Sequence, residues 1–347
     1  MIDRTLLVDS SYLLKRSING AKNAHTDEFG HIGGLYSFFT VVRKLIKDHS
    51  INKVIFVWDG ENGGIYRHNL DLSYKSNRTN KEWYNKIELT ESQIIREQEK
   101  DESLLKQKIR IKSYAEELFI RQIEVDKIEA DDLIAQYCLN YHNKEEIFLF
   151  TNDRDFLQLL EYNITILFGN VSEPITKGSF FMKFGYHYSN ALPIKIICGD
   201  TSDNIEGIKG ISEKTLFKYF PNLKFKKMSV REICIEADKI NKERVENKKK
   251  PLKALENLLN GVKRLKLNYK LINLSKPFLN EQAYSEIELL DLPLSPDDRS
   301  SKYLYKMMVE DGFLSQYGGN FSDYVKPFYT VIMKEKERLT EYYKNNK

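Results

Sequence analysis

Acidic side chains gather on the two flanks of one helix–strand pattern, residues 128–155. Three of them begin the helical pattern, and two follow the apolar run Ile147–Phe150. They are Glu129, Asp131, Asp132, Asp153 and Asp155. An open α/β sheet usually places its ligands beyond the carboxyl ends of its strands. Carboxylates gathered there repel one another, and a pair of divalent cations is the simplest counter-charge.

Further aspartates occupy similar positions, after strand-like runs or at helix starts just beyond them: Asp9, Asp59, Asp200 and Asp203. Each alone is explained by the preference of acids for helix N-termini and turns. Their number instead favours a metal cluster. A set of carboxylates without thiolate or imidazole favours Mg²⁺ or Mn²⁺ over zinc. Two such ions about 4 Å apart are a known device for phosphodiester hydrolysis.

The elements that must position these acids form a βαβ pattern. Thr5–Val8 is an apolar run before Asp9, and Lys53–Trp58 is a second run before Asp59. Gly33–Asp48 lies between them and places its apolar residues on one helical face. A right-handed βαβ unit makes the two strands parallel, so both aspartates are expected at the same sheet edge.

Shorter runs extend this α/β region. Gln122–Val125 and Thr165–Phe168 are further strand candidates, and Leu192–Asp200 closes the region. Residues 67–112 are mostly charged and retain helical composition without a strong apolar face. This composition predicts a solvated helical excursion or a mobile arch and argues against a packed helix.

Basic residues are concentrated in one part of the chain. Residues 207–270 hold 18 Lys/Arg against 7 Asp/Glu, a local +11, so the remaining 36 basic and 43 acidic residues give −7. This asymmetry is typical of an enzyme that grips a polyanion in one place and binds metal in another. The GIKGIS segment, 207–212, adds glycine N–H groups at a helix start, which can cradle a phosphate.

Three residues in SYKSNR could contact substrate directly. Lys75 and Arg78 could clamp the scissile phosphate, and Tyr74 could stack on an unpaired base. The alternative is a solvated charged patch. The chain has no Walker-type or dinucleotide-binding glycine motif after a strand. Ser11 stands where haloacid-dehalogenase phosphatases have a second aspartate, which disfavours that family.

The bulk composition narrows the class further. No apolar run reaches the length of a membrane span, and the first residues do not form a signal peptide. Three widely spaced cysteines favour a reducing, cytoplasmic setting, the host cytoplasm for a viral protein.

Six motifs follow one another along the chain: VDSS at Asp9, VWDG at Asp59, YKSNR at 74–78, EADDLIA at 129–135, TNDRDF at 151–156 and GDTSDNIEGIKGIS at 199–212. Together they resemble the 5′-nuclease superfamily, over roughly residues 4–275. That superfamily comprises flap endonucleases, the 5′→3′ exonuclease domain of bacterial DNA polymerase I and bacteriophage enzymes. The layout looks most like the bacteriophage flap endonuclease and phage ribonuclease H type. Arg154 and Ser212 stand where the family more often has small residues.

The resemblance implies a PIN-like, mostly parallel sheet flanked by helices, with a helical arch over about 67–112. It implies a nuclease domain over 1–200, a helix-three-turn-helix DNA-binding module over 201–275 and a C-terminal helical region over 276–347. The C-terminal region either buttresses the nuclease or docks a single-strand-binding protein or clamp. A monomer is expected.

The resemblance also implies roles for individual residues. The first metal ion would bind Asp9, Asp59, Glu129, Asp131 and Asp132, and the second Asp153, Asp155, Asp200 and Asp203. Lys75 and Arg78 would act on the scissile phosphate. Duplex DNA would contact Gly207, Lys209, Gly210 and Lys214, with K⁺ on the hairpin carbonyls of 207–212, while Tyr74 matches the aromatic beside Lys75.

We therefore expect a Mg²⁺-dependent, structure-specific 5′-nuclease with exonuclease and flap endonuclease activity. RNA–DNA hybrids are further expected substrates, with ribonuclease H activity and a role in primer removal during replication. One alternative is a non-catalytic DNA-binding replication accessory of the same fold, which would predict gaps in the carboxylate set. Another is a single-strand ribonuclease of the PIN type, which the basic 207–270 module and the arch disfavour.

Overall fold

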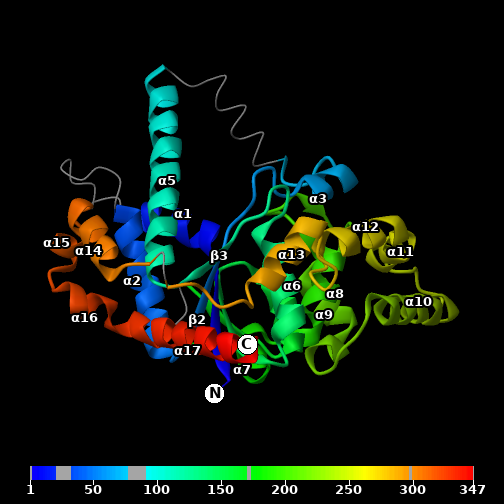
Figure 1. Ribbon diagram of the computed structural model, residues 1–347. Coiled ribbons are helices and arrows are strands. Elements are labelled where there is room, and N and C mark those ends of the chain that lie inside the picture. Colours follow the sequence, from blue (N-terminus) through cyan, green and yellow to red (C-terminus); the bar gives the residue numbers. More distant parts are fainter. Residues whose placement is uncertain (1, 21–32, 77–90, 170–172, 297–298, 347) are drawn as a thin grey trace. The chain divides into compact units, whose positions relative to one another are not determined.

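The computed structural model describes residues 2–20, 33–76, 91–169, 173–296 and 299–346 (Figure 1). They form two compact units that alternate along the chain. Unit 1 comprises Met1–Gly63, Leu89–Asn152 and Leu279–Lys347, and unit 2 comprises Gly64–Glu88 and Asp153–Phe278. In the described part of the chain, none of the helices combines the length and apolar character needed to cross a membrane.

Unit 1 contributes four parallel strands, in the order β3–β2–β1–β4, to a five-stranded sheet that also contains β5 (Thr165–Phe168). The strands are β1 (Asp3–Asp9), β2 (Lys53–Val57), β3 (Arg121–Ile123) and β4 (Glu145–Thr151). Val8 of β1 lies opposite Phe56 on one side and Phe150 on the other. The predicted parallel βαβ arrangement is confirmed, and β1, β2 and β4 end at the same sheet edge.

Helix α2 (Gly33–Asp48) buries the apolar face that its periodicity predicts. Phe38 stacks on Trp58 at 6.1 Å between ring centroids and meets Phe56 edge-on at 5.1 Å. These aromatic contacts hold α2 against β2 and the segment that follows it. The other helices of this part of unit 1 are α1 (Ser10–Gly20), α5 (Glu91–Glu117) and α6 (Ala130–Tyr141).

Helix α5 differs from the unpacked excursion that its composition predicts. Residues 79–90 of the predicted arch lie outside the described residues. From Ser103 onward, however, helix α5 has a buried face. Gln107 is 2% exposed; its Nε2 donates to Ser103 Oγ and its Oε1 accepts from Leu35 N. Gln107 and Ser103 take buried positions one and two turns before Ile111, because hydrogen bonds satisfy them. Hydropathy alone cannot show such a face.

The segment after residue 278 packs on the sheet of unit 1. Arg121 of β3 forms a buried ion pair with Glu335, and Tyr114 Oη donates to Asp311 Oδ2 at 2.7 Å. This packing favours the buttress over a separate appendage. The helices of this segment are α13 (Glu281–Leu289), α14 (Ser301–Glu310), α15 (Phe313–Tyr317), α16 (Phe321–Val325) and α17 (Tyr329–Asn345), with the short η4 (Lys326–Phe328).

Unit 2 is mostly helical and contains the basic part of the chain. Its first elements are α3 (Ile65–Leu70), η1 (Arg154–Tyr162), β5 (Thr165–Phe168), α7 (Lys177–Phe184), η2 (Tyr188–Asn190) and α8 (Ala191–Cys198). The antiparallel strands β6 (Gly199–Asp200) and β7 (Ile205–Glu206) follow. The last are α9 (Glu213–Tyr219), η3 (Pro221–Lys224), α10 (Val230–Glu246), α11 (Lys253–Asn260) and α12 (Val262–Ile272).

The buried Asn268 joins three of these elements. Its Nδ2 donates to Ile196 O on α8 and to Glu206 O on β7, each at 2.9 Å. Leu271 and Ile272 on the same helix pack with Ile205 and Tyr74. Helix α12 therefore fixes the hairpin that carries Asp200 and the residues around it.

Candidate active site

In unit 1, Asp9 and Asp59 extend from neighbouring strands. Asp9 ends β1 and is 8% exposed; its Oδ1 accepts from Tyr12 N and its Oδ2 from Thr151 Oγ1, both at 3.1 Å. Asp59 Oδ1 accepts from Ala130 N at 2.9 Å, at the start of α6. Strand β4 and helix α6 thus contribute to the surroundings of these two carboxylates.

The acids at the start of α6 are more buried than ordinary helix-start acids. Glu129 is 6% exposed and Asp132 is 1% exposed. Glu129 is the N-cap of α6, but its side chain makes no capping hydrogen bond, and Asp59 binds the first helical N–H instead. Burial of acids is costly unless they are neutralised. Asp131 lies beside them in the first turn of α6. Among the described residues, the unit 1 acids do not form a group of three whose oxygens all lie within 4.8 Å of one another.

In unit 2, Asp155, Asp200 and Asp203 come together. Carboxylate oxygens of all three lie within 4.8 Å of one another. Asp200 Oδ1 accepts from Ser202 N at 2.8 Å and Ser202 Oγ at 2.6 Å, which orients the carboxylate. Asp153 caps η1 by accepting from Asp155 N at 2.7 Å, so one of its oxygens is used in local structure. The three-carboxylate set has the hard oxygen donors that suit a divalent cation.

Lys195 is a residue of this cluster that sequence reasoning missed. Its Nζ forms ion pairs with Asp155 and, at 2.7 Å, with Asp200. Burial opposes ionisation of Asp200, but Lys195 and Ser202 outweigh it and hold the pKa of that carboxyl below its ordinary value. One ammonium against three carboxylates leaves a formal charge of −2, which a divalent cation would balance. A lysine in the otherwise apolar LPIKIIC, five residues before Asp200, was the signal available in the sequence.

The Lys75 segment is attached to the same cluster. Lys75 N donates to Asp203 O at 2.8 Å, and Lys75 has a left-handed backbone with φ of 53°. Asn204 Nδ2 donates to Ser73 O at 2.8 Å and to Ser76 Oγ at 2.9 Å. The loop that carries Asp203 therefore positions the predicted phosphate-binding lysine. Arg78 lies outside the described residues.

Tyr74 is placed differently from its predicted base-stacking role. Tyr74 is 6% exposed and packs with Ile205, Leu271 and Ile272. In this conformation it anchors the Lys75 segment to the core of unit 2, and stacking on a base would require that cluster to open. Its apolar setting could not be read from SYKSNR alone.

The 207–212 segment forms a tight connection between β7 and α9. A Cβ on Gly207 would lie 2.0 Å from Cys198 O, and Gly210 has φ of 82°, so both positions require glycine. Ser212 caps α9 by accepting from Thr215 N at 3.3 Å. Lys209, Gly210 and Lys214 are exposed, as contacts to a nucleic-acid backbone would require.

The comparison with protein families decides the family of this chain. The family model of the 5′-3′ exonuclease N-terminal, resolvase-like domain matches residues 4–185. The chain belongs to the 5′-3′ exonuclease family. It is a 5′-nuclease.

Curated relatives of this 5′-nuclease carry the same description. A 5′-3′ exonuclease of Mycoplasmopsis pulmonis is 28% identical over 223 residues, which cover 64% of this chain and 67% of the relative. A 5′-3′ exonuclease of Bacillus subtilis is 29% identical over 225 residues, covering 62% of this chain and 69% of the relative.

A solved structure supports the fold of the 5′-nuclease. The flap endonuclease of bacteriophage T5, in a complex with DNA and metal ions, aligns with a TM-score of 0.61 at 18% identity. The alignment covers 89% of this chain and 99% of the phage chain. The predicted PIN-like, mostly parallel sheet flanked by helices is confirmed, and the similarity to the phage enzyme is one of fold.

Proposed function

We propose that this 5′-nuclease is Mg²⁺-dependent and cuts duplex DNA that carries a 5′ single-stranded flap or end. It would leave a 5′-phosphate and a 3′-hydroxyl. The observation that carries the proposal is the Asp155–Asp200–Asp203 cluster, whose loop also binds the backbone of Lys75. The β6–β7 hairpin thus carries two of the three carboxylates and bonds the backbone of the lysine that we propose to bind phosphate.

The carboxylates of each unit are proposed to hold one divalent cation. The unit 1 set is Asp9, Asp59, Glu129, Asp131 and Asp132, and the unit 2 set is Asp153, Asp155, Asp200 and Asp203. Both sets offer only oxygen donors, which suits Mg²⁺ and also Mn²⁺. When bound, such ions activate a water and stabilise the leaving oxygen in phosphodiester hydrolysis.

The chain's own cations would act on the phosphate. Lys75 is proposed to bind the scissile phosphate, with Arg78 beside it in sequence. Lys195 is proposed to neutralise Asp155 and Asp200 until a cation takes over that role, because its ammonium already pairs with both. Asn204 would act through Lys75 as a positioning residue.

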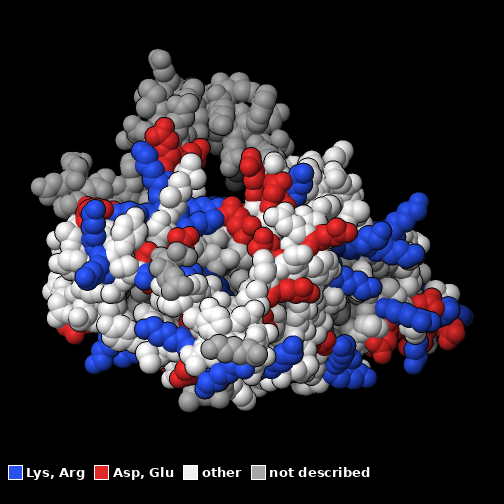
Figure 2. All heavy atoms as spheres, viewed as in Figure 1, with Lys and Arg blue, Asp and Glu red and all other residues white. Residues whose placement is uncertain are grey.

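DNA would be held by its backbone. The exposed Lys209, Gly210 and Lys214 stand at the start of α9, where N–H groups and ammonium groups can bind phosphate without reading bases. Figure 2 shows Lys and Arg side chains gathered over α10–α12. The T5 flap endonuclease structure contains DNA, which supports DNA as the substrate here. RNA–DNA hybrids, K⁺ at 207–212 and a single-strand-binding protein or clamp as partner remain proposals.

The deciding experiment is cleavage of a 5′-flap duplex with Mg²⁺ or EDTA by wild type and Asp155→Asn. We expect Mg²⁺-dependent cutting near the flap junction and a loss of at least about 100-fold in rate for Asp155→Asn. DNA binding should be retained. Asp238→Asn on α10 is the control, since that partly exposed acid pairs only with Lys242 among the described side chains.

A primer-like RNA–DNA hybrid in the same assay tests the ribonuclease H activity. Tight flap binding without cutting in either Mg²⁺ or Mn²⁺ would contradict the enzyme and favour the non-catalytic DNA-binding accessory. Equal rates for Asp155→Asn and wild type would instead remove the unit 2 cluster from the reaction.

A further inference from the structure

Large apolar side chains of α7 and the segment after η3 are exposed in unit 2. Phe181 is 44% exposed, Met182 88% and Phe225 70%. The rings of Phe181 and Phe225 lie 6.1 Å apart, so these two elements form one surface. We call residues 174–190 and 220–228 together the α7–η3 face. Apolar groups gathered on a surface commonly mark an interaction site.

The fold holds Phe225 in this exposed position. Asn190 is fully buried, and its Nδ2 donates to Leu223 O and Lys226 O, each at 2.7 Å. Its Oδ1 accepts from Met228 N at 2.8 Å. One buried amide therefore fixes the backbone on both sides of Phe225. The exposed ring is carried by a tightly bonded segment, which lowers the entropy cost of binding a partner.

The charge on the α7–η3 face is entirely positive. The two segments contain five lysines and no aspartate or glutamate. Lys227 pairs with Glu161 at 2.8 Å. The other four make no ion pair with any side chain that the structure describes: Lys177, Lys183, Lys224 and Lys226. Four ammonium groups beside exposed apolar side chains favour a partner that is both acidic and apolar.

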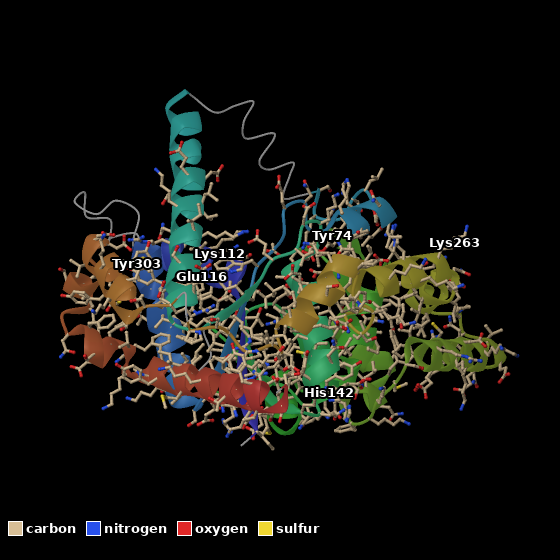
Figure 3. All side chains as sticks on the ribbon, in the orientation of Figure 1. Tyr74, Lys112, Glu116, His142, Lys263 and Tyr303 are labelled. Carbon is tan, nitrogen blue, oxygen red and sulfur yellow. The ribbon has the colours of Figure 1, made fainter. Side chains whose placement is uncertain are left out.

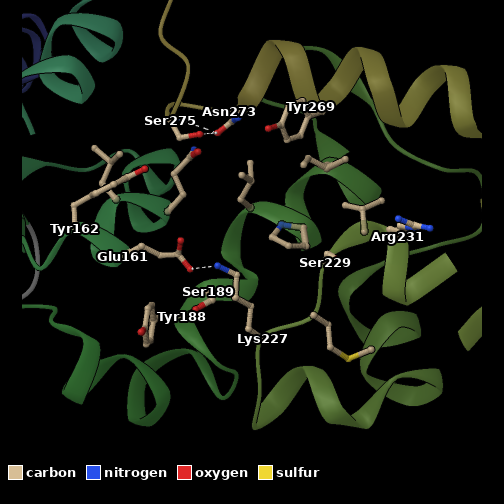
Figure 4. A pocket seen from close by; sticks show the side chains of 17 residues that line it. Glu161, Tyr162, Tyr188, Ser189, Lys227, Ser229, Arg231, Tyr269, Asn273 and Ser275 are labelled. Atoms are coloured by element: carbon tan, nitrogen blue, oxygen red, sulfur yellow. Dashed lines mark hydrogen bonds and ion pairs between the residues drawn. The ribbon is translucent and has the colours of Figure 1, made fainter. Parts of the chain in front are cut away.

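Two cavities open along this face and share Tyr188 as a wall. The first has a volume of about 350 Å³ and is lined by Phe181, Tyr186 and Phe225, with Lys177 and Lys224 at its edge. The second, of about 450 Å³, is shown in Figure 4. Its lining includes the apolar and tyrosine side chains Tyr162, Tyr188, Leu192, Met228 and Tyr269, together with Arg231 and the Lys227–Glu161 ion pair.

We propose that the α7–η3 face binds an acidic peptide segment of a partner protein, which inserts aromatic or aliphatic side chains into these cavities. Aspartates or glutamates of the segment would pair with Lys177, Lys224 and their neighbours. Phenylalanine and methionine are enriched in protein interfaces, and Met182 cannot offer the flat ring on which a base stacks. A peptide therefore fits this face better than a single-stranded nucleic acid. The proposal does not depend on the nuclease activity.

Fluorescence anisotropy of labelled peptides tests the proposal. The probes join a run of aspartates to a run that contains leucine and phenylalanine, in several orders. We expect binding that weakens at least about tenfold in Phe225→Ser and in Lys224→Glu, as for interface hot spots. The matched controls are Tyr303→Ser and Lys302→Glu on α14, two exposed positions outside the face, and they should bind normally (Figure 3).

Specificity is checked with the peptides themselves. Replacing their aspartates by lysines, or their leucine and phenylalanine by serines, should abolish binding. Flap cleavage by Phe225→Ser should equal that of wild type, which shows that the variant is folded. The proposal is overturned if no probe binds, or if the variants and their controls bind alike. It is also overturned if Phe225→Ser and Lys224→Glu weaken binding of labelled oligothymidylate and leave peptide binding unchanged, since the face would then serve nucleic acid.

Discussion

At the residue scale, Asn204 is a side chain outside the carboxylate set that we propose to position Lys75. Its side-chain amide donates hydrogen bonds to Ser73 and Ser76, which lie 131 and 128 positions earlier in the chain. Removing it should let the Lys75 segment move, although Lys75 N would still bond Asp203 O. We expect Asn204→Ala to lower kcat for flap cleavage about tenfold, with a smaller change in KM.

A double-mutant cycle identifies the route of this effect. If Asn204 acts through Lys75, the variant with Asn204→Ala and Lys75→Ala should be no slower than Lys75→Ala alone. Asn222→Ala, an exposed asparagine in η3, is the control. Fully additive effects in the cycle would show that Asn204 does not position Lys75.

Glu124 supplies a pH-dependent contribution to stability. Burial raises the pKa of Glu124, but hydrogen bonds from Lys108 and Lys112 outweigh it and leave the pKa below the ordinary value of 4.5. Its stabilisation is therefore complete above about pH 4.5 and is lost as the pH falls through the lower, folded-state pKa. Glu124→Gln should reduce the free energy of unfolding at pH 7 by about 1 kcal/mol or less.

The measurement is urea unfolding of wild type and Glu124→Gln between pH 7 and about pH 3. The difference should stay constant down to about pH 5 and shrink below it. Glu116→Gln, exposed on the helix that carries Lys112, should show no such pattern (Figure 3). A difference that grows on acidification would contradict the assigned ion pairs.

At the element scale, α17 is bound to β3 through a buried ion pair. The side chains of Arg121 and Glu335 are 2% and 0% exposed. Arg121 also donates from Nε to Leu290 O at 2.7 Å. Removing one member of such a pair leaves an uncompensated buried charge. Glu335→Ala should lower the free energy of unfolding by about 3 kcal/mol or more.

Chemical denaturation of Glu335→Ala and of Glu337→Ala, an exposed control on the same helix, measures this effect. A loss below about 1 kcal/mol would show that the pair contributes little. The contacts of Glu335 and its neighbours also predict the effect of deleting the end of the chain. Deleting residues 328–347 removes Glu335 and the fully buried Phe328, so unit 1 should lose stability along with any docking surface on α17.

Helices and strands could be predicted from the sequence where the periodicity of apolar residues matches the face that is buried in the structure. The strands before Asp9 and Asp59 and the buried face of α2 follow from hydrophobic periodicity. The packed face of α5 could not be predicted, because Ser103 and Gln107 are buried by hydrogen bonds that hydropathy does not register. Lys195 and Asn204 were missed for a related reason, since their roles depend on partners brought close only by the fold.

At the scale of the whole molecule, charge is separated along the chain. Residues 207–270 carry a net +11, against −7 for the remainder. If backbone phosphates are bound by this part, DNA affinity should fall steeply with salt. The logarithm of the DNA association constant falls linearly with the logarithm of the salt concentration, and Lys209→Ala and Lys214→Ala should each make this negative slope shallower by about 0.9. Each substitution should also weaken binding equally for DNA of different base sequences.

Anisotropy titrations with flap DNA at several salt concentrations give these slopes. Lys302→Ala, an exposed lysine of unit 1, should leave the slope unchanged. Slopes identical to wild type for both Lys209→Ala and Lys214→Ala would remove them from the phosphate contacts. The overall charge of +4 hides this asymmetry, whereas the local count reveals it.

The alternation of the two units along the chain also governs how the protein can form during its synthesis. Arg121 and Glu335 are separated by 214 positions. The ion pair between β3 and α17 can therefore form only after α17 has emerged from the ribosome. The residues of unit 2 all precede Leu279 and are therefore synthesised before α17. Nascent chains that stop short of α17 would therefore expose an unfinished sheet to chaperones and proteases while the basic helices are already in place.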